Sequence, residues 1–144
     1  MITLDANVLI ARCNEADVSH LRAVDVIDHH EWDEFLTSAV TLAEVLVRPT
    51  KDDWVTVCQE YLRSIAVFVV PVEEDDALGI ADLAAEHNLK SADAVILQMA
   101  ITTSEALVTF DKRLANVARA VGFPVITDAP DSMADWAAPW CSAE

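Results

Sequence analysis

Four acidic residues lie inside or beside apolar runs of the sequence: Asp5, Glu44, Asp93 and Asp111. A carboxylate that leaves water in such surroundings is destabilising unless a group of opposite charge compensates it. No extended run of Lys or Arg stands beside these positions. The natural counter-charge is a hard divalent cation such as Mg²⁺ or Mn²⁺, which binds oxygen ligands. These residue types therefore predict a metal-dependent phosphodiesterase.

The four acids need not all bind one ion, because Mg²⁺ takes one or two carboxylates directly and keeps several waters. Such a site activates a water molecule for in-line attack and neutralises charge on the scissile phosphate. Each acid alone has a simpler explanation. Asp5 and Asp111 could cap helices, Asp93 could complement a helix dipole, and Glu44 could be an exposed helical residue. Their joint placement favours a shared site.

The elements that would position these acids alternate between strands and helices. Short apolar or β-branched runs predict the strands, and apolar residues at helical spacing predict the helices. This alternation is typical of an α/β fold with three layers, α/β/α, around a parallel sheet of about five strands. The expected strands cover residues 1–5, 34–37, 67–70, 106–109 and 124–127, and the expected helices cover residues 6–13, 16–30, 39–48, 51–65, 78–88, 92–102 and 111–121.

Local signals set several of these boundaries. Ser38 and Ser91 are each suited to cap the helix that follows. Pro49 is expected to end the helix that begins at residue 39, because proline disfavours a helical conformation in the residue before it. The run 67–70 lacks alternation of polar and apolar residues, which is typical of a parallel strand covered on both faces.

This scheme brings most of the acids to one edge of the sheet. Asp5 and Asp111 follow the first and fourth expected strands, and Asp93 lies in the first turn of a helix. In open α/β sheets, ligands bind outside the carboxyl ends of the strands. These three acids can therefore converge there, and Glu44 lies in the middle of the helix after the second strand.

The chain is strongly acidic and rich in apolar residues. Its 144 residues include 25 acidic and 9 basic side chains, give a formal net charge of −16, and are 53% hydrophobic. We expect one nuclease-like domain over residues 1–127 and a tail, 128–144, that packs on it or on a partner. The charge disfavours broad nucleic-acid binding but permits a local site. Basic residues stand close in sequence to two of the acids: Arg48, Lys51, Lys112 and Arg113.

Other features of the sequence bear on the compartment. No apolar run approaches the roughly 20 residues needed to span a membrane, and no secretion signal is visible. The cysteines Cys13, Cys58 and Cys141 are odd in number and widely spaced, so we expect reduced thiols. Both observations predict a cytoplasmic protein with no membrane partner.

The segments that carry the acids resemble those of the PIN-domain ribonucleases and, among them, the VapC-like toxins of bacterial toxin–antitoxin pairs. The likeness covers residues 1–127 in both order and spacing, which is far more specific than any single motif. The matching segments are Leu4-Asp5-Ala6-Asn7-Val8-Leu9-Ile10, Thr41-Leu42-Ala43-Glu44-Val45-Leu46, Ser91-Ala92-Asp93-Ala94 and Val108-Thr109-Phe110-Asp111.

This resemblance implies a set of roles and partners. It implies that Asn7 and Thr109 make hydrogen bonds that orient the carboxylates. It implies endonucleolytic cleavage of single-stranded or loop RNA, a homodimer, and a toxin silenced by an antitoxin whose basic segment enters the active site. The acidic site that holds one or two Mg²⁺ or Mn²⁺ ions would consist of Asp5, Glu44, Asp93 and Asp111.

Two other classes of protein are open alternatives. A non-catalytic binding module would use its acidic surface to recruit a basic partner. A phosphoryl-transfer protein of haloacid-dehalogenase-like or receiver-like type would also place an Asp after an early strand. The first type needs a second Asp two residues later, where this chain has Asn7. The second needs an acidic pair after the first strand and a Lys after the last, and neither is visible.

Overall fold

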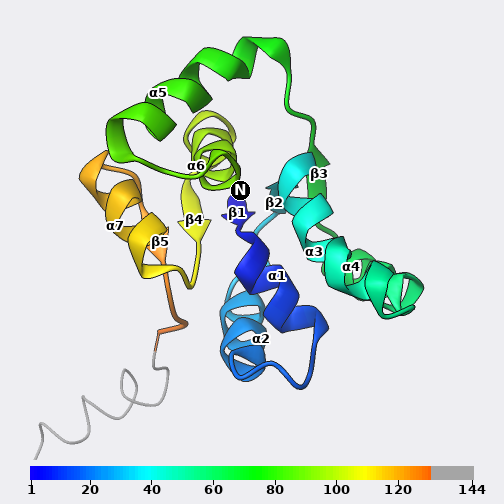
Figure 1. Ribbon diagram of the computed structural model, residues 1–144. Coiled ribbons are helices and arrows are strands. Elements are labelled where there is room, and N and C mark those ends of the chain that lie inside the picture. The colour runs from blue at the N-terminus through cyan, green and yellow to red at the C-terminus, as the bar shows by residue number, and fades with distance from the viewer. Residues whose placement is uncertain (131–144) are drawn as a thin grey trace, which may run out of the picture.

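Five short parallel strands form one sheet in the computed structural model, which describes residues 1–130 (Figure 1). Their order across the sheet is β3-β2-β1-β4-β5. The strands are β1 (Ile2–Leu4), β2 (Phe35–Ser38), β3 (Phe68–Val70), β4 (Ala106–Val108) and β5 (Val125–Ile126). The predicted α/β fold with a parallel sheet of about five strands is confirmed.

The strand order reverses direction at the centre of the sheet. From β1 the chain moves outward to β2 and β3, and then it returns to β4 on the other side of β1. Residue Ile2 of β1 pairs with Phe35 of β2 on one side and with Ala106 of β4 on the other. A crevice that can hold a ligand opens at such a reversal, outside the carboxyl ends of the strands. The carboxyl ends of β1 and β4 therefore mark the expected site.

Two groups of helices pack against the sheet. Buried residues of α1 to α4 join β1 and β2 in one core cluster. Buried residues of α5, α6 and α7 join β4 in a second cluster. Figure 1 shows the sheet between these groups, with α5, α6 and α7 on one side. The helices are α1 (Ala6–Cys13), α2 (His20–His29), α3 (Ala39–Lys51), α4 (Val55–Ile65), the short 3₁₀ helix η1 (Glu74–Asp76), α5 (Ala77–His87), α6 (Ser91–Thr103) and α7 (Lys112–Ala120).

The helix expected over residues 16–30 begins later than predicted. Turns occupy most of residues 14–19, where Asn14 Oδ1 accepts a hydrogen bond from Ala16 N and Asp17 Oδ1 accepts one from Ser19 N. Short polar side chains compete in this way with helical hydrogen bonding. The apolar Leu21 is also 74% exposed, so it is not part of the buried face of α2.

Two predicted boundary signals are wrong. Pro49 does not end α3, which continues to Lys51 with Pro49 buried inside its last turn. The missing N–H of proline removes a single helical bond, and the helix end is closed one turn later by Asp52 N donating to Arg48 O. Ser91 is the first residue of α6 rather than its cap, and Lys90 occupies the cap position without a side-chain bond. The cap predicted at Ser38 is present.

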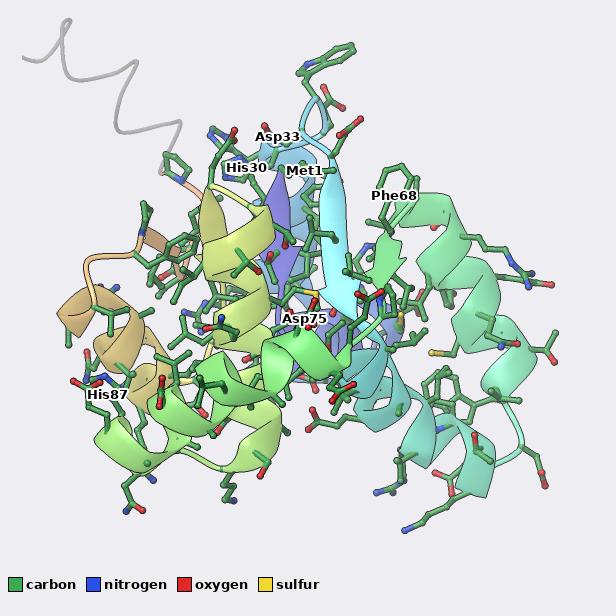
Figure 2. The ribbon with its side chains drawn as sticks, turned by 90° about the horizontal axis from the view of Figure 1, so that it is seen from above. Met1, His30, Asp33, Phe68, Asp75 and His87 are labelled. Carbon is green, nitrogen blue, oxygen red and sulfur yellow. The ribbon has the colours of Figure 1, made fainter. Side chains whose placement is uncertain are left out.

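The strand expected to be covered on both faces is an edge strand. β3 pairs only with β2, and Phe68 and Val69 are 56% and 45% exposed. Figure 2 shows the Phe68 ring at the start of β3, at the outer edge of the sheet. The apolar run was correctly identified as a strand but wrongly placed in the interior, because an edge strand beside an apolar surface has the same composition.

Some expectations concern parts of the chain at its end. The first residues of the predicted tail contact the domain, because Asp128 bonds Arg22 and Ala129 packs against the first core cluster, and the packing predicted for residues 131–144 lies outside the described residues. Cys13 and Cys58 are free thiols buried in the first core cluster, while Cys141 is also outside the described range. Across residues 1–130 no helix has both the length and the hydropathy that a bilayer crossing requires.

Candidate functional site

Asp5 is the buried centre of the candidate site. It follows β1, caps the N-terminus of α1, and is only 6% exposed. Its Oδ1 accepts a hydrogen bond from Ala6 N at 2.7 Å, and its Oδ2 accepts one from Thr109 Oγ1 at 2.7 Å. Burial raises the pKa of Asp5 from 3.8 to about 6, although these two hydrogen bonds oppose the rise. Each oxygen still has a lone pair available for a cation.

Thr109 and Asn7 connect the first helix to the segment after β4. Thr109 is fully buried, and its hydroxyl donates to Asp5 while accepting from Asp111 N at 3.1 Å. The Asn7 side chain accepts a hydrogen bond from Phe110 N at 3.1 Å and donates a longer one to Thr109 Oγ1 at 3.5 Å. These contacts fix the orientation of the Asp5 carboxylate relative to the backbone at Asp111.

Asp111 has a structural role that does not use its whole carboxylate. It caps α7, where its Oδ1 accepts hydrogen bonds from Arg113 N at 2.8 Å and Leu114 N at 3.2 Å. Both contacts use one oxygen and hold the side chain in place. The simple explanation of Asp111 as a helix cap is therefore correct, and it leaves Oδ2 free for a ligand.

Glu44 and Asp93 complete an electrostatically linked group of four acids. Burial raises the pKa of Asp93, and the negative charge of Asp111 raises it further. Burial also raises the pKa of Glu44, with a second contribution from Asp93. The charges of Asp93 and Glu44 in turn raise the pKa of Asp5. Thr109 Oγ1 bonds both Asp5 Oδ2 and Asp111 N, which places these two acids side by side. Charge interactions link Asp93 to Asp111 and Glu44 to Asp93.

The four acids form no direct ion pair within residues 1–130, and only Asp93 is partly compensated, because the positive charges of Lys90 and Arg113 lower its pKa. That stretch of the chain also contains no group of three His, Cys, Asp or Glu side chains already arranged to hold an ion. A hard cation does not require such a group, because Mg²⁺ takes one or two carboxylates and fills its other positions with water. The all-oxygen donor set fits Mg²⁺ or Mn²⁺.

Two basic residues near the site, Lys90 and Arg22, were not identified from the sequence. The positive charge of Lys90 lowers the pKa of Asp93, against the larger effects of burial and Asp111. Its position three residues before Asp93 could have indicated this. Arg22 of α2 stacks over the Phe110 ring, with its Cζ 4.1 Å from the ring centroid. No local signal could have indicated that contact, because the two residues are far apart in the sequence.

The sequence matches a known family along most of its length. Residues 2–120 match the family described as the PIN domain. No match was found among the curated proteins. The matched range contains all four acids together with Asn7 and Thr109. The resemblance found from the sequence motifs is therefore confirmed.

Solved structures share the fold at low sequence identity. A toxin–antitoxin complex from Klebsiella pneumoniae aligns with a TM-score of 0.69 and 24% identity, over 88% of this chain and 97% of that chain. The sarcin–ricin loop cleaving toxin VapC20 of Mycobacterium tuberculosis aligns with a TM-score of 0.66 and 19% identity, over 85% and 96%. FitAcB from Neisseria gonorrhoeae gives 0.68 and 23%, over 88% and 97%. At these identities the likeness establishes the fold.

Proposed function

Because the chain belongs to the PIN-domain family, we propose that it is a metal-dependent endoribonuclease that acts as the toxin of a toxin–antitoxin pair. The observation that carries the proposal is the group of four acids at the point where the strand order reverses, none of which forms a salt bridge within residues 1–130. We assign the nuclease unit to residues 1–127. The neighbours described as toxins support this assignment through their common fold.

The cation would be held by Asp5, Asp93 and Asp111, with Glu44 acting directly or through water. When bound, Mg²⁺ or Mn²⁺ would supply charge neutralisation at a phosphodiester and activation of water for in-line attack. Asp5 can contribute because both its oxygens are fixed by hydrogen bonds, at Ala6 N and at Thr109 Oγ1. A carboxylate held in this way needs little reorganisation when a cation arrives.

Thr109 and Asn7 are proposed to position the carboxylates rather than to contact RNA. The Thr109 hydroxyl lies between Asp5 Oδ2 and Asp111 N, so it sets the separation of these two acids. Asn7 holds the backbone at Phe110 in place. Hydrogen-bonding partners of this kind orient metal ligands, and their loss commonly lowers metal affinity or activity by about 10- to 100-fold.

Cleavage of RNA tests the proposal directly. Total RNA and a loop-containing RNA should be cut internally in the presence of Mg²⁺ or Mn²⁺, and chelation with EDTA should stop the reaction. Asp93→Asn should be inactive. Glu105→Gln is the matched control, because this exposed carboxylate lies at the opposite, amino end of β4 and pairs with the N-terminal ammonium group. Cleavage that persists in EDTA, or a fully active Asp93→Asn variant, would contradict the assignment.

An antitoxin with a basic segment is the proposed protein partner. The net charge of −16 and the four acids, which form no salt bridge within residues 1–130, favour a basic segment at the active site. Apolar contact is available in a groove of about 410 Å³ at the edge of the sheet, which we call the apolar groove. Leu42 and Leu46 of α3 line it, whereas Glu44, two residues from each, lies on a different side of the same helix, so a partner that covers both surfaces must extend around α3. Other residues of its lining include Leu62, Val67, Phe68 and Val69.

Co-expression provides the test for this partner. We expect a small reading frame beside the gene that encodes a protein with a basic tail, and its product should co-purify with the protein and inhibit its RNA cleavage. A truncated partner without its basic segment should still bind but inhibit less. The proposal also includes a cytoplasmic homodimer, whose mass light scattering can measure on the purified chain. A monomeric mass at micromolar concentration would contradict the dimer alone.

A further inference from the structure

A basic pocket lies beside the acidic site, in a chain that has few basic residues. Only 9 of the 144 residues are Lys or Arg. Three of them, Arg22, Lys112 and Arg119, line one pocket of about 360 Å³, which we call the basic pocket. Asp111 lines the same pocket and belongs to the group of four acids, so the two regions are continuous. Asp128 is the other carboxylate in the lining, and it leaves the basic residues in excess.

One face of α7 supplies much of this pocket. Lys112, Ala115, Asn116 and Arg119 all line it. Their spacing of three, four and seven residues places them on the same side of the helix. Lys112 and Arg119 are separated by about 10 Å along the helix axis, at 1.5 Å per residue. Within residues 1–130 neither of these two side chains is in a salt bridge, so both charges are available to a ligand.

Arg22 supplies a cation that is held in place. Its Nε donates to Thr127 O at 3.0 Å and to Asp128 Oδ1 at 2.7 Å, and its Nη2 donates to Asp128 Oδ2 at 3.3 Å. The guanidinium also stacks on the Phe110 ring, with its Cζ 4.1 Å from the centroid. The pair with Asp128 is open to solvent, because Asp128 is 63% exposed. Exposed pairs are weak, so an incoming anion can displace this carboxylate.

We propose that the basic pocket binds phosphate groups of the single-stranded RNA next to the scissile bond. This inference rests on the proposed nuclease function, because it concerns the residues that bind the same RNA substrate. Arg and Lys side chains bind phosphates through charge-assisted hydrogen bonds, and a fixed guanidinium is suited to phosphate geometry. The pocket would repel a basic antitoxin segment, which favours RNA as its occupant. Thus an acidic protein can hold RNA at one local surface.

Binding can be measured separately from cleavage. A fluorescently labelled single-stranded RNA would be titrated against the full chain carrying Asp93→Asn, so that the RNA is not cut, at several salt concentrations. For single strands the slope of log affinity against log salt is about −0.7 for each phosphate contact. Lys112→Ala with Arg119→Ala should flatten the slope by about 1.4 and weaken binding roughly tenfold at about 0.1 M salt.

Two control pairs make this measurement specific. Lys112→Arg with Arg119→Lys keeps both charges and should keep the wild-type slope. Lys51→Ala with Arg63→Ala removes two exposed charges from α3 and α4, at the β3 edge of the sheet, and should leave the slope unchanged. An unchanged slope in Lys112→Ala with Arg119→Ala, or an equal loss in the Lys51 and Arg63 pair, overturns the proposal.

Asp128 provides a test in the opposite direction. Asp128→Asn removes the carboxylate that occupies Arg22, so RNA should bind several-fold more tightly. An unchanged or weaker affinity would contradict the inclusion of Arg22 in the pocket. If RNA binds through the pocket and the wild type with Mn²⁺ fails to cut, the proposed catalysis fails and the pocket stands. If the wild type cuts and the salt slopes are equal, only the pocket fails.

Discussion

Within residues 1–130, the centre and the edge of the sheet differ in the kind of group that has no counterpart in the chain. At the carboxyl end of β1, the carboxyl group of Asp5 is buried at 6% exposure and forms no salt bridge. At the edge, Phe68 and Val69 of β3 are apolar groups that face solvent. Folding normally produces the opposite arrangement, with charge outside and apolar surface inside. Both regions are therefore better explained by ligands than by the stability of the chain alone.

The missing partner differs in chemistry between the two regions. At the centre, burial and the charges of neighbouring acids raise the pKa values of Asp5, Glu44 and Asp93, so an added positive charge would stabilise their ionised forms. A small cation can relieve both effects without displacing a side chain. Within residues 1–130 nothing apolar covers the apolar groove at the edge, and a protein segment is large enough to do so. The comparison therefore sets the proposed ion at the centre against the proposed protein partner at the edge, and substitutions can test each of the two proposals.

Asp5→Asn should have the largest effect on activity. It keeps the size of the side chain but removes the charge at the buried centre of the acid group. Loss of several kcal/mol of charge stabilisation corresponds to a fall in cleavage rate of about three orders of magnitude. Mn²⁺ should raise the melting temperature of the wild type and not that of the variant. Asp33→Asn is the control, because this exposed residue lies before β2, at the amino end of the sheet (Figure 2).

The pH dependence of stability should change at the same residue. The folded chain raises the pKa of Asp5 from 3.8 to about 6, so the folded state binds this proton more tightly than the unfolded state. Its contribution is complete below about pH 4 and is lost as the pH rises through about 6. One pKa unit corresponds to about 1.4 kcal/mol, which gives a loss of about 3 kcal/mol. In Asp5→Asn this loss should be absent.

Urea unfolding in EDTA measures this effect. The free energy of unfolding would be compared between the wild type and Asp5→Asn at about pH 4 and pH 7.5, because the difference cancels the groups that titrate in both proteins. Between these pH values, the free energy of unfolding of the variant should rise relative to that of the wild type by about 3 kcal/mol. A constant difference would show that the Asp5 carboxylate is not destabilised by burial. Saturating Mn²⁺ should reduce this relative increase, since the cation stabilises the ionised carboxylate of Asp5 in the wild type.

Thr109→Val should have an intermediate effect, because it removes only the hydroxyl that holds Asp5. Cleavage should fall by about 10- to 100-fold, as is usual for groups that orient metal ligands. The affinity for Mn²⁺, measured by calorimetry, should fall with it, which a general loss of stability would not produce. Thr3→Val is the matched control, because Thr3 is equally buried in β1 but its hydroxyl bonds Ser104 Oγ at 2.7 Å. Equal losses in both variants would remove the proposed positioning role.

The sequence could predict the parts of this site that depend on local order. A strand followed by an acid placed Asp5 and Asp111, and the first turn of α6 contains Asp93 as predicted. Each of these acids is placed by the strand directly before it or by the helix that contains it, so only nearby residues are needed for the prediction. The apolar run at β3 was also recognised, but the alternation rule could not distinguish a covered strand from an exposed edge beside a groove.

The parts that local rules could not predict depend on contacts between distant segments. The bond from Thr109 to Asp5 joins residues 104 positions apart, and only the family resemblance implied a hydrogen-bonding role for Thr109, because the bond requires β1 and β4 to pair although two strands intervene in sequence. The position of Arg22 over Phe110 likewise requires α2 to meet the end of β4. Strand order sets both contacts, and composition does not encode strand order. Local rules also failed where a tertiary contact overrode them, as at the buried Pro49.

Phe68→Ser should have the smallest effect on the stability and RNA cleavage of the chain, and it should still weaken binding of the proposed antitoxin. The ring is 56% exposed, so its loss should change the free energy of unfolding by less than about 1 kcal/mol. Leu107→Ala, at a position with no exposure, should cost about 2 to 5 kcal/mol. RNA cleavage by Phe68→Ser should be unchanged, because the residue lies at the edge of the sheet and not beside the acids.

Binding of the antitoxin should distinguish the edge from the rest of the exposed apolar surface. Phe68→Ser should weaken that binding about tenfold or more, since an aromatic side chain at the centre of an interface often supplies over 1 kcal/mol. Val57→Ser is the control, because Val57 is 48% exposed on α4 but does not line the apolar groove. If both variants bind the antitoxin as the wild type does, the apolar groove is not the docking surface. If Phe68→Ser binds normally and also loses RNA cleavage, the edge and the centre are not separate in function, and the comparison between them fails.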